Sequence, residues 1–273
     1  MLANAPPNPL QVSRPLQRVA FRSGKLQQGT RDIAEETAIA LSYGGSTYAV
    51  MMATPNDLED FGLGFSLTER IVSSASEIES FSIVSGDNGI DLQMWLAKPR
   101  EDRLAARRRY FAGPTGCGLC GVDSLSEAMR PAPAVGNRMR LESKAITQAM
   151  NCLRPHQALN ERTGAVHAAA FWTSAAGLVC LREDVGRHNA LDKLVGALAN
   201  QGQSGPEGIV LLTSRVSVEM VQKTAVLGAE IMVAVSAPTA LAIRTAETCG
   251  ITLVAVARPD GFEVFTHPHR FVS

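Results

Sequence analysis

The second half of the chain alternates short, mainly apolar stretches with amphipathic ones, and this pattern narrows the choice of fold more than any other feature. The apolar stretches are GAVHAAAFWT (164–173), GLVCLRED (177–184), GIVLLTS (208–214), IMVAVS (231–236), ITLVAVA (251–257) and FEVFT (262–266). The stretches with helical spacing are residues 189–200, 217–230 and 238–250. Because strands that are apolar on both sides need cover on both faces, residues 141–273 are predicted to form a three-layer α/β domain.

The first half has the signals of a smaller α+β domain, which we place at residues 31–140. Gly44-Gly45 and the DNG turn at 87–89 each separate two apolar runs, so each predicts a β-hairpin. A helix is expected over residues 55–72, with Pro55 in its first turn, and further helices over 101–110 and from residue 124. The predicted boundary lies in the proline-rich residues 130–140, and residues 1–30 are expected to form a flexible tail.

Charge, hydropathy and cysteine content exclude several classes of protein. The 26 Lys and Arg residues balance 26 Asp and Glu residues, so no global field draws the chain to nucleic acid or to an anionic membrane. No window approaches the apolar length of a membrane span, and the N-terminal residues lack the apolar core of a secretory signal. Five scattered cysteines do not form a disulfide framework, which favours a reducing, cytoplasmic location.

A glycine-rich stretch, GPTGCGLCG (113–121), contains Cys117 and Cys120 and is compatible with three kinds of chemistry. A structural zinc site needs four ligands, but there is no second pair of cysteines, and His267 and His269 are too close in sequence for the usual spacing. A redox pair usually begins at a helix N-terminus, whereas Cys117 precedes the expected helix by seven residues. A sulfur carrier needs an uncrowded thiolate on a pliable backbone, and four glycines around the cysteines supply this.

A zinc deaminase is excluded by the order of its residues. That signature is H-x-E followed by P-C-x-x-C, whereas here His167 comes after the cysteines and alanine occupies the position of the glutamate. His167 is therefore interpreted as a histidine of the core, or as one that supports a site without contacting the ligand.

Polar residues follow several of the predicted strands, in EDVGRHNALDK (183–193), SRVS (214–217) and SAPT (236–239). Ligands of open α/β sheets collect at the carboxyl ends of strands, and helix N-termini attract phosphates. We therefore expect Arg187 and Arg215 to bind a phosphate-bearing ligand there. In FTHPHR (265–270), Phe265 could stack on a planar ring while His267, His269 and Arg270 meet phosphates.

Several motifs occur together in one order and resemble those of the formate dehydrogenase accessory sulfurtransferase family, FdhD/NarQ. They are ATPNDLEDFGLGFSLTE (53–69), GCGLCGV (116–122), HAAAFW (167–172), EDVGRHNALDKL (183–194), TSRVSVEMVQK (213–223), VSAPTALA (235–242) and FTHPHR (265–270). The resemblance extends from about residue 35 to the C-terminus.

The resemblance implies a small α+β domain followed by a cytidine-deaminase-like α/β domain, in a homodimer. It implies a protein that accepts sulfur from a cysteine desulfurase and passes it to the molybdenum cofactor, bis-molybdopterin guanine dinucleotide, before insertion into formate dehydrogenase. By motif match, Cys117 would bear the persulfide with Cys120 as its partner, and Phe265, Thr266, His267, Pro268, His269 and Arg270 would bind the cofactor.

Two other functions remain open: a cofactor-binding escort without sulfur transfer, and a dithiol oxidoreductase. The remaining cysteines, Cys152, Cys180 and Cys249, lie in apolar surroundings and are predicted to be core residues.

Overall fold

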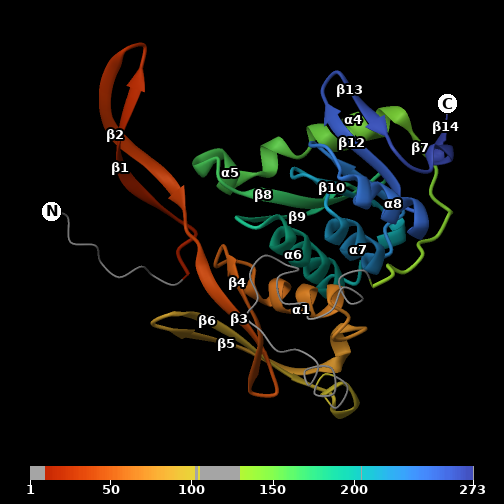
Figure 1. Ribbon diagram of the computed structural model, residues 1–273, viewed down its shortest axis with the longest axis horizontal. Coiled ribbons are helices and arrows are strands. Elements are labelled where there is room, and N and C mark those ends of the chain that lie inside the picture. The colour runs from red at the N-terminus through yellow and green to blue at the C-terminus, as the bar shows by residue number, and fades with distance from the viewer. Residues whose placement is uncertain (1–9, 102–103, 105–129, 204, 273) are drawn as a thin grey trace.

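The computed structural model describes residues 10–101, 104, 130–203 and 205–272 (Figure 1). The predictions for Cys117 and Cys120, for most of the basic helix at 101–110 and for the helix from residue 124 lie outside these residues. None of the described helices is long and apolar enough to cross a membrane.

The larger sheet has six strands in the order β13-β12-β11-β10-β8-β9. Its strands are β8 (His167–Thr173), β9 (Gly177–Asp184), β10 (Ile209–Leu212), β11 (Ile231–Ala234), β12 (Thr252–Arg258) and β13 (Gly261–Val264). The three central strands, β10 to β12, are parallel, and each pairing with β8, β9 or β13 is antiparallel.

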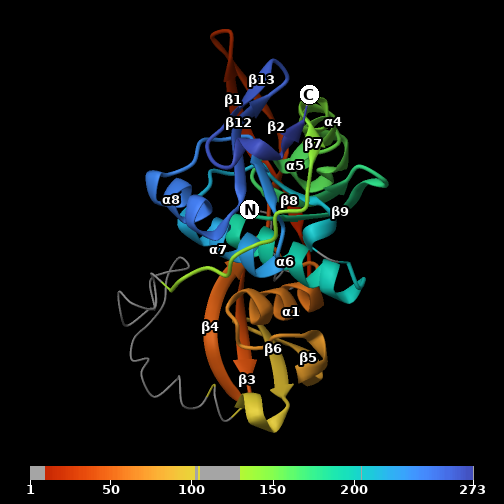
Figure 2. The ribbon, with the colours of Figure 1, turned by 90° about the vertical axis from the view of Figure 1, so that its right-hand side faces the viewer.

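Helices cover both faces of this sheet, as the apolar strands predicted (Figures 1 and 2). Val210, Leu212 and Met232 pack with α6 (Arg187–Asn200), α7 (Val218–Leu227) and α8 (Ala240–Cys249) on one face. The alternate residues, including Leu211 and Val233, pack with α4 (Ser143–Asn151) on the other. Successive side chains of a strand point to opposite faces, so every residue of β10 and β11 is buried in one of two cores.

A four-stranded sheet in the order β4-β3-β6-β5 forms the centre of the first half. Its strands are β3 (Thr37–Tyr43), β4 (Ser46–Ala53), β5 (Ile78–Gly86) and β6 (Gly89–Leu96), and α1 (Leu58–Thr68) covers one face. Gly44 and Gly45 have φ values of 55° and 75°, which a two-residue hairpin turn requires. Both predicted hairpins and the predicted helix are confirmed, although the helix is shorter than expected.

The two halves meet where α1 crosses α6 without intervening side chains. A Cβ atom on Gly64 would lie 1.7 Å from the carbonyl oxygen of Asp192, and one on Gly196 would lie 1.9 Å from that of Asp60. Each helix therefore places a glycine against the backbone of the other, which allows an approach that any larger residue would prevent.

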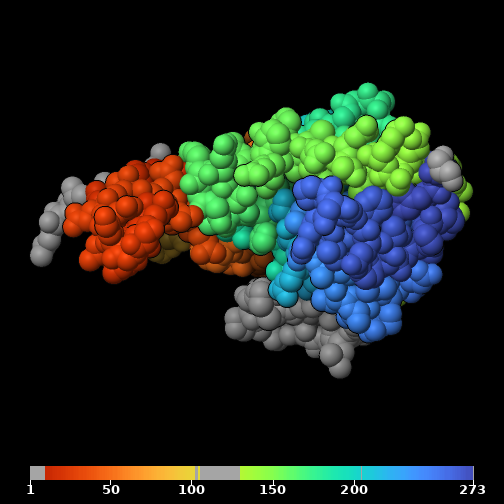
Figure 3. Space-filling view, turned by 90° about the horizontal axis from the view of Figure 1, so that it is seen from above, coloured from red at the N-terminus to blue at the C-terminus, as the bar shows by residue number. Residues whose placement is uncertain are grey.

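Residues 13–34 form a two-stranded antiparallel ribbon, β1 (Ser13–Arg22) with β2 (Lys25–Ala34), that extends away from the rest of the molecule (Figures 1 and 3). The expectation of a flexible tail is therefore wrong for residues 13–30. Because its polar and apolar residues alternate along extended strands, the ribbon lacks the continuous apolar run by which the other strands were found.

The connection at 130–140 contains no helix or strand. It lies against the second half, since the Val135 amide donates to Cys249 and the Arg138 and Met139 amides donate to the Glu230 carboxylate. The remaining elements are β7 (Leu141–Glu142), α5 (Ala158–Thr163), β14 (Phe271–Val272) and the 3-10 segments Ala75–Glu77, Arg154–His156, Gly205–Glu207 and Pro268–Arg270.

Replacing Gly64 with Ala is expected to destabilise the protein by about 1–3 kcal/mol, because the added methyl group meets a backbone carbonyl that no rotamer change can move. Urea denaturation would measure the loss. Gly29→Ala is the matched control, because nothing lies within 4 Å of a Cβ atom placed there. Equal stabilities for the two variants would contradict the proposed close contact between α1 and α6.

Candidate functional site

The sheet topology brings the three polar junctions of the second half to one edge, where the parallel strands end. Arg187 and His188 open α6, Ser217 precedes α7 and Thr239 precedes α8. The His188 Nε2 lies 3.4 Å from the Ser217 hydroxyl, and the Thr239 amide donates to the Val216 carbonyl at 3.0 Å. The expectation that these junctions lie together at the carboxyl end of the sheet agrees with this placement.

This edge has a surplus of groups that attract anions. The Nε of Arg187 is buried and has no hydrogen-bond partner in the part of the chain that the structure describes, while Arg215 is exposed. Burial and the nearby Arg187 charge lower the pKa of His167, so its imidazole tends to be neutral. The N-termini of α6 and α7 add partial positive charge. A phosphate or carboxylate is the chemistry that these groups would hold.

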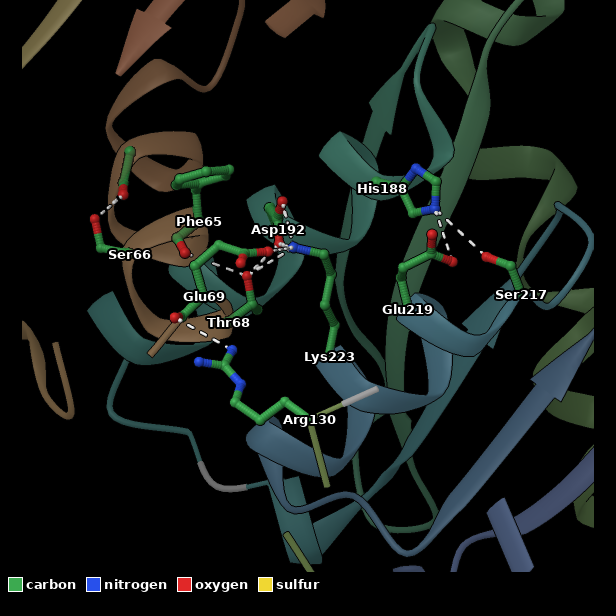
Figure 4. A network of polar contacts seen from close by, with 11 residues as sticks. Phe65, Ser66, Thr68, Glu69, Arg130, His188, Asp192, Ser217, Glu219 and Lys223 are labelled. Atoms are coloured by element: carbon green, nitrogen blue, oxygen red, sulfur yellow. Dashed lines mark hydrogen bonds and ion pairs between the residues drawn. The ribbon is translucent and has the colours of Figure 1, made fainter. Parts of the chain in front are cut away.

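Two pairs of ionisable side chains connect α6 to α7 (Figure 4). In one pair α6 supplies the basic residue, and in the other it supplies the acidic residue. His188 and Asp192 lie one turn apart on α6, and they face Glu219 and Lys223, which lie one turn apart on α7. His188 Nε2 is 3.8 Å from Glu219 Oε2, and Lys223 Nζ is 2.9 Å from Asp192 Oδ1. The hydrogen bond from His188 is the largest of the effects that lower the pKa of Glu219 to about 2.

Lys223 also connects the two halves of the chain. Its ammonium group donates to the hydroxyl of Thr68 at 2.9 Å and to the carboxylate of Glu69 at 3.1 Å, at the end of α1. Burial acts to lower the pKa of Lys223, but the Asp192 and Glu69 carboxylates outweigh it and raise the pKa. Lys223 therefore stays charged, and its charge is neutralised from both halves.

Asp184, at the end of β9, forms the second polar connection between the halves. It is fully buried with Lys193, whose Nζ lies 2.7 Å from Asp184 Oδ2. The same carboxylate accepts hydrogen bonds from the backbone amides of Thr54 and Gly186, and Lys193 donates to the Thr54 carbonyl at 2.8 Å. Burial lowers the pKa of Lys193, against the opposing attraction of Asp184. This network fixes the start of α6, and with it Arg187 and His188.

The FTHPHR segment lies at the opposite edge of the sheet, beside the beginning of β12. The Phe265 amide donates to Leu253, and the Thr266 hydroxyl donates to the Ile251 carbonyl at 2.6 Å and accepts from the Leu253 amide. Phe265 packs partly buried against the core of the sheet. The first two residues of the segment therefore fasten it to the sheet.

Arg270 is buried and has protein partners for each of its three nitrogens. It donates to the carboxylate of Glu230 at 3.3 Å, to the Thr252 hydroxyl at 2.8 Å and to the Gly136 carbonyl at 2.7 Å. The guanidinium thus holds the linker on the sheet. Its contacts give no support to the prediction that it meets phosphates.

The two histidines of the segment are more exposed. His267 adopts a left-handed conformation with φ 47°, which turns the chain into the 3-10 segment, and its Nε2 lies 3.0 Å from the Glu247 carbonyl. The His269 Nε2 lies 3.0 Å from the amide oxygen of Asn137. The rings meet edge to face at 5.7 Å.

The sheet separates Arg187 and Arg215, which are expected to bind a phosphate-bearing ligand, from residues 265–270, which are expected to bind the cofactor. The arginines lie where β9 and β10 end, whereas Thr266 contacts the residues at which β12 begins. Because the strands run in parallel, these are opposite edges of the sheet. The assignment of both groups to one cofactor stays a prediction.

Cys152, Cys180 and Cys249 were predicted to be core residues, and the prediction is confirmed for Cys180 and Cys249. Both are buried, and burial raises the pKa of each thiol. Cys152 is half-buried against the core below α4. Within residues 10–101 and the described parts of 130–272, no three His, Cys, Asp or Glu side chains group as a metal site.

Sequence reasoning gave no role to three charged side chains that shape this site: Asp184, Lys193 and Glu219. The signal was present for the first two, since an aspartate ends an apolar strand and a lysine occurs among the leucines of an amphipathic helix. A charge in such a place is usually paired. Their partners at Thr54 and Asn56 are about 130 residues away, and the sequence gives no indication of that pairing.

Comparison with known proteins places the chain among close relatives. The sequence model of the FdhD/NarQ family matches residues 34–272. The chain is 51% identical over 260 residues to a protein of Agrobacterium fabrum, covering 95% of this chain and 96% of the relative. It is 52% identical over 263 residues to a protein of Brucella abortus, covering 96% and 98%. Both relatives are named sulfur carrier protein FdhD.

A solved structure shares the fold. A crystal structure from Desulfotalea psychrophila, described as that of a candidate formate dehydrogenase accessory protein, superimposes with a TM-score of 0.75 at 27% sequence identity. The match covers 96% of this chain and 100% of the other.

Lys193→Met is expected to destabilise the protein by about 3–5 kcal/mol, because it leaves the Asp184 carboxylate buried without its charge partner. Urea denaturation would measure the change, with Lys144→Met as control, since Lys144 is an exposed lysine paired with Glu142. The double variant Asp184→Asn/Lys193→Met should recover part of the loss. If Lys193→Met and Lys144→Met proved equally stable, the buried pair would not have its proposed role.

The Glu219 carboxylate is expected to contribute to the free energy of unfolding at neutral pH and to lose this contribution in acid. The folded-state pKa of Glu219 is about 2 instead of the usual 4.5, so its contribution is complete above pH 4.5 and is lost as the pH falls toward 2. Glu219→Gln should therefore lower the free energy of unfolding at pH 7 and flatten its decline between pH 4.5 and 3. Urea titrations at those values would test this against Glu207→Gln, an exposed control. Parallel pH profiles for wild type and Glu219→Gln would contradict the pairing with His188.

Proposed function

The chain belongs to the FdhD/NarQ family, and on this basis we propose that it is a sulfur carrier protein that acts in the maturation of formate dehydrogenase. The observation that carries the proposal is the 51–52% identity, over nearly the whole of both chains, to relatives named sulfur carrier proteins. In this proposal one molecule carries the sulfur on a cysteine and also binds the acceptor of that sulfur, and the folded core holds the two together.

The sulfur is carried on Cys117 in this proposal. The Cys117 thiolate attacks the terminal sulfur of a persulfide on a cysteine desulfurase, which leaves as a thiolate, and Cys117 becomes the persulfide. The terminal sulfur is then given to the acceptor, and Cys117 returns to a thiolate. Attack of Cys120 on the Cys117 sulfur would instead release sulfide and form a disulfide between the two cysteines, which cellular thiols can reduce.

The acceptor in this proposal is bis-molybdopterin guanine dinucleotide, bound as a substrate. Arg187 and Arg215 are the groups that we assign to its phosphates, because the first has a buried Nε without a partner in the described chain and the second is exposed. For residues 265–270 the assignment rests on the family motif, with Phe265 and the two histidines as the groups facing the ligand. A ligand that contacts both sites has to reach both edges of the sheet.

Arg130 is the first residue after Cys120 that the structure describes. Arg130 donates to the Glu69 carbonyl at 3.5 Å (Figure 4). Its own carbonyl accepts from the side-chain amide of Gln222 on α7. Arg130 is ten positions after Cys120 in the sequence, a length of chain that spans at most about 36 Å.

Two other functions use the same fold without carrying sulfur. An escort protein would bind the cofactor and use the cysteines only for contact with a partner, and a dithiol oxidoreductase would cycle between Cys117–Cys120 dithiol and disulfide with generic thiols. We favour the sulfur carrier because both close relatives bear that name.

Incubation with a cysteine desulfurase and cysteine is expected to add roughly 32 Da, one sulfur atom, to the peptide that contains Cys117. Mass spectrometry without reductant measures the adduct. Cys117→Ala should abolish it, and Cys120→Ala should retain it, since Cys120 is expected only to resolve the persulfide.

Each competing function predicts a different spectrum. Absence of the adduct from both the wild type and Cys120→Ala, with both cysteines still reduced, supports the escort. A loss of two hydrogens in the wild type, with no adduct in Cys120→Ala, supports the oxidoreductase. An adduct that persists in Cys117→Ala would overturn the assignment of Cys117. Cys152→Ala serves as the control for a cysteine outside the motif.

A further inference from the structure

His188, in the first turn of α6, faces Glu219 in the first turn of α7. Its Nε2 lies 3.8 Å from Glu219 Oε2 and 3.4 Å from the Ser217 hydroxyl. Because a carboxylate only accepts hydrogen bonds, Nε2 carries a proton whether the ring is neutral or charged. Hydrogen bonds from Ser217 and from its own amide also hold the Glu219 carboxylate in place. The ring of His188 is therefore fixed from the side of α7.

The second ring nitrogen of His188, Nδ1, is available to a ligand. Figure 4 shows that it points away from Glu219, and it has no hydrogen-bond partner among the described residues. The side chain is 14% exposed, and Nδ1 is not one of its buried atoms. Nδ1 accepts a hydrogen bond in the neutral ring and donates one in the charged ring. Only the charged ring can therefore bind an anion through Nδ1.

His167 and Arg187 bring two more nitrogen-bearing side chains to the same place. Burial, and then the charges of Arg187 and His188, lower the pKa of His167, which begins β8. Charges act in this way over short distances, so the three side chains gather at one point of the carboxyl edge. The Nε of Arg187 is buried and has no partner in the described part of the chain, which leaves a donor for a ligand.

The balance of charge at this edge depends on the proton of His188. The other charged groups near it are Arg187 on α6, Glu219 on α7, Asp184 on β9 with its partner Lys193, and the exposed Arg215 in the loop before α7. Asp184 and Lys193 neutralise each other, and Glu219 opposes Arg187, since a pKa of about 2 keeps Glu219 ionised at neutral pH. An anion that reaches Arg187 therefore meets a carboxylate nearby, and a proton on His188 offsets that carboxylate.

We propose that protonated His188 is an anion-binding residue of the carboxyl edge, which holds a phosphate group through Nδ1 beside Arg187, and that Glu219 is the residue that positions its ring. Binding is then strongest where His188 is charged, and it weakens as the pH rises. The inference rests on the proposed phosphate-binding role of Arg187. It does not depend on the persulfide of Cys117, because the mass of that adduct is measured without an anion at this edge.

Binding of sulfate to the full chain at about pH 6 and about pH 8 tests the role of His188. Sulfate is a tetrahedral dianion at both values, whereas an ordinary histidine loses its charge between them. The dissociation constant, measured from the NMR shifts of backbone amides, is expected to be about fivefold lower at the acid value. His188→Gln keeps a donor but cannot become charged, so it should bind sulfate equally at both values. The control His156→Gln, at an exposed histidine near α5, should keep the fivefold ratio.

The titration of the His188 ring is a second measurement, made on the wild-type protein. Ring nitrogen signals of the labelled full chain are followed across this pH range in sulfate and in chloride of equal ionic strength. Saturating sulfate is expected to raise the midpoint of His188 by about one pH unit and to leave that of His156 unchanged. In the neutral ring of His188 the signals should place the proton on Nε2, the nitrogen that faces Glu219.

Three results would overturn the proposal: equal sulfate affinity of the wild type at both pH values, a fivefold ratio that persists in His188→Gln, or a His188 midpoint that is the same in sulfate and chloride. A ratio that is lost in His167→Gln and kept in His188→Gln would assign the effect to His167 instead. Absence of sulfate binding at both values would also overturn it, together with the phosphate-binding role of Arg187, and would leave the sulfur carrier to its own test.

Discussion

The arrangement of the two halves depends on a fully buried ion pair, Asp184 with Lys193. A charge pair in an apolar interior has to recover the cost of desolvation, and it does so only when further hydrogen bonds complete its geometry. Here the additional partners are the Thr54 amide and carbonyl and the Gly186 amide. The pair is therefore satisfied only when the end of β4, the end of β9 and the start of α6 meet, and these are the junctions that position the candidate site.

The same helix, α6, connects this structural role to the proposed function. Its first turn presents Arg187 and His188 at the carboxyl edge of the sheet, while its next turn contributes Asp192 and Lys193 to the two interdomain networks. The proposed binding of an anion at the first turn and the fit between the halves therefore depend on the same helix. The proposed sulfur transfer needs such a frame, because a persulfide on a long segment has to meet an acceptor that is held still.

The sequence predicted those parts of the molecule in which local pattern and tertiary environment agree. The strands β10 to β12 and their helices follow from continuous apolar runs, and the hairpin at Gly44-Gly45 follows from the backbone that the turn requires. The ribbon at 13–34 was missed because an extended arm with little packing has no core-facing pattern. Within the site, Arg187 and Arg215 could be placed from topology, whereas the burial of Arg270 depends on Glu230, 40 residues earlier in the chain.

The close contact of α1 with α6 restricts the amino-acid substitutions that such a protein can accept during evolution. Gly64 and Gly196 each face a peptide carbonyl of the opposite helix, so no repacking of side chains elsewhere makes room for a methyl group at either position. A larger residue is accommodated only if the helices separate, which also pulls Asp192 and Lys223 away from Thr68 and Glu69. Substitutions of the two glycines and of the charged residues one turn away are therefore expected to occur together.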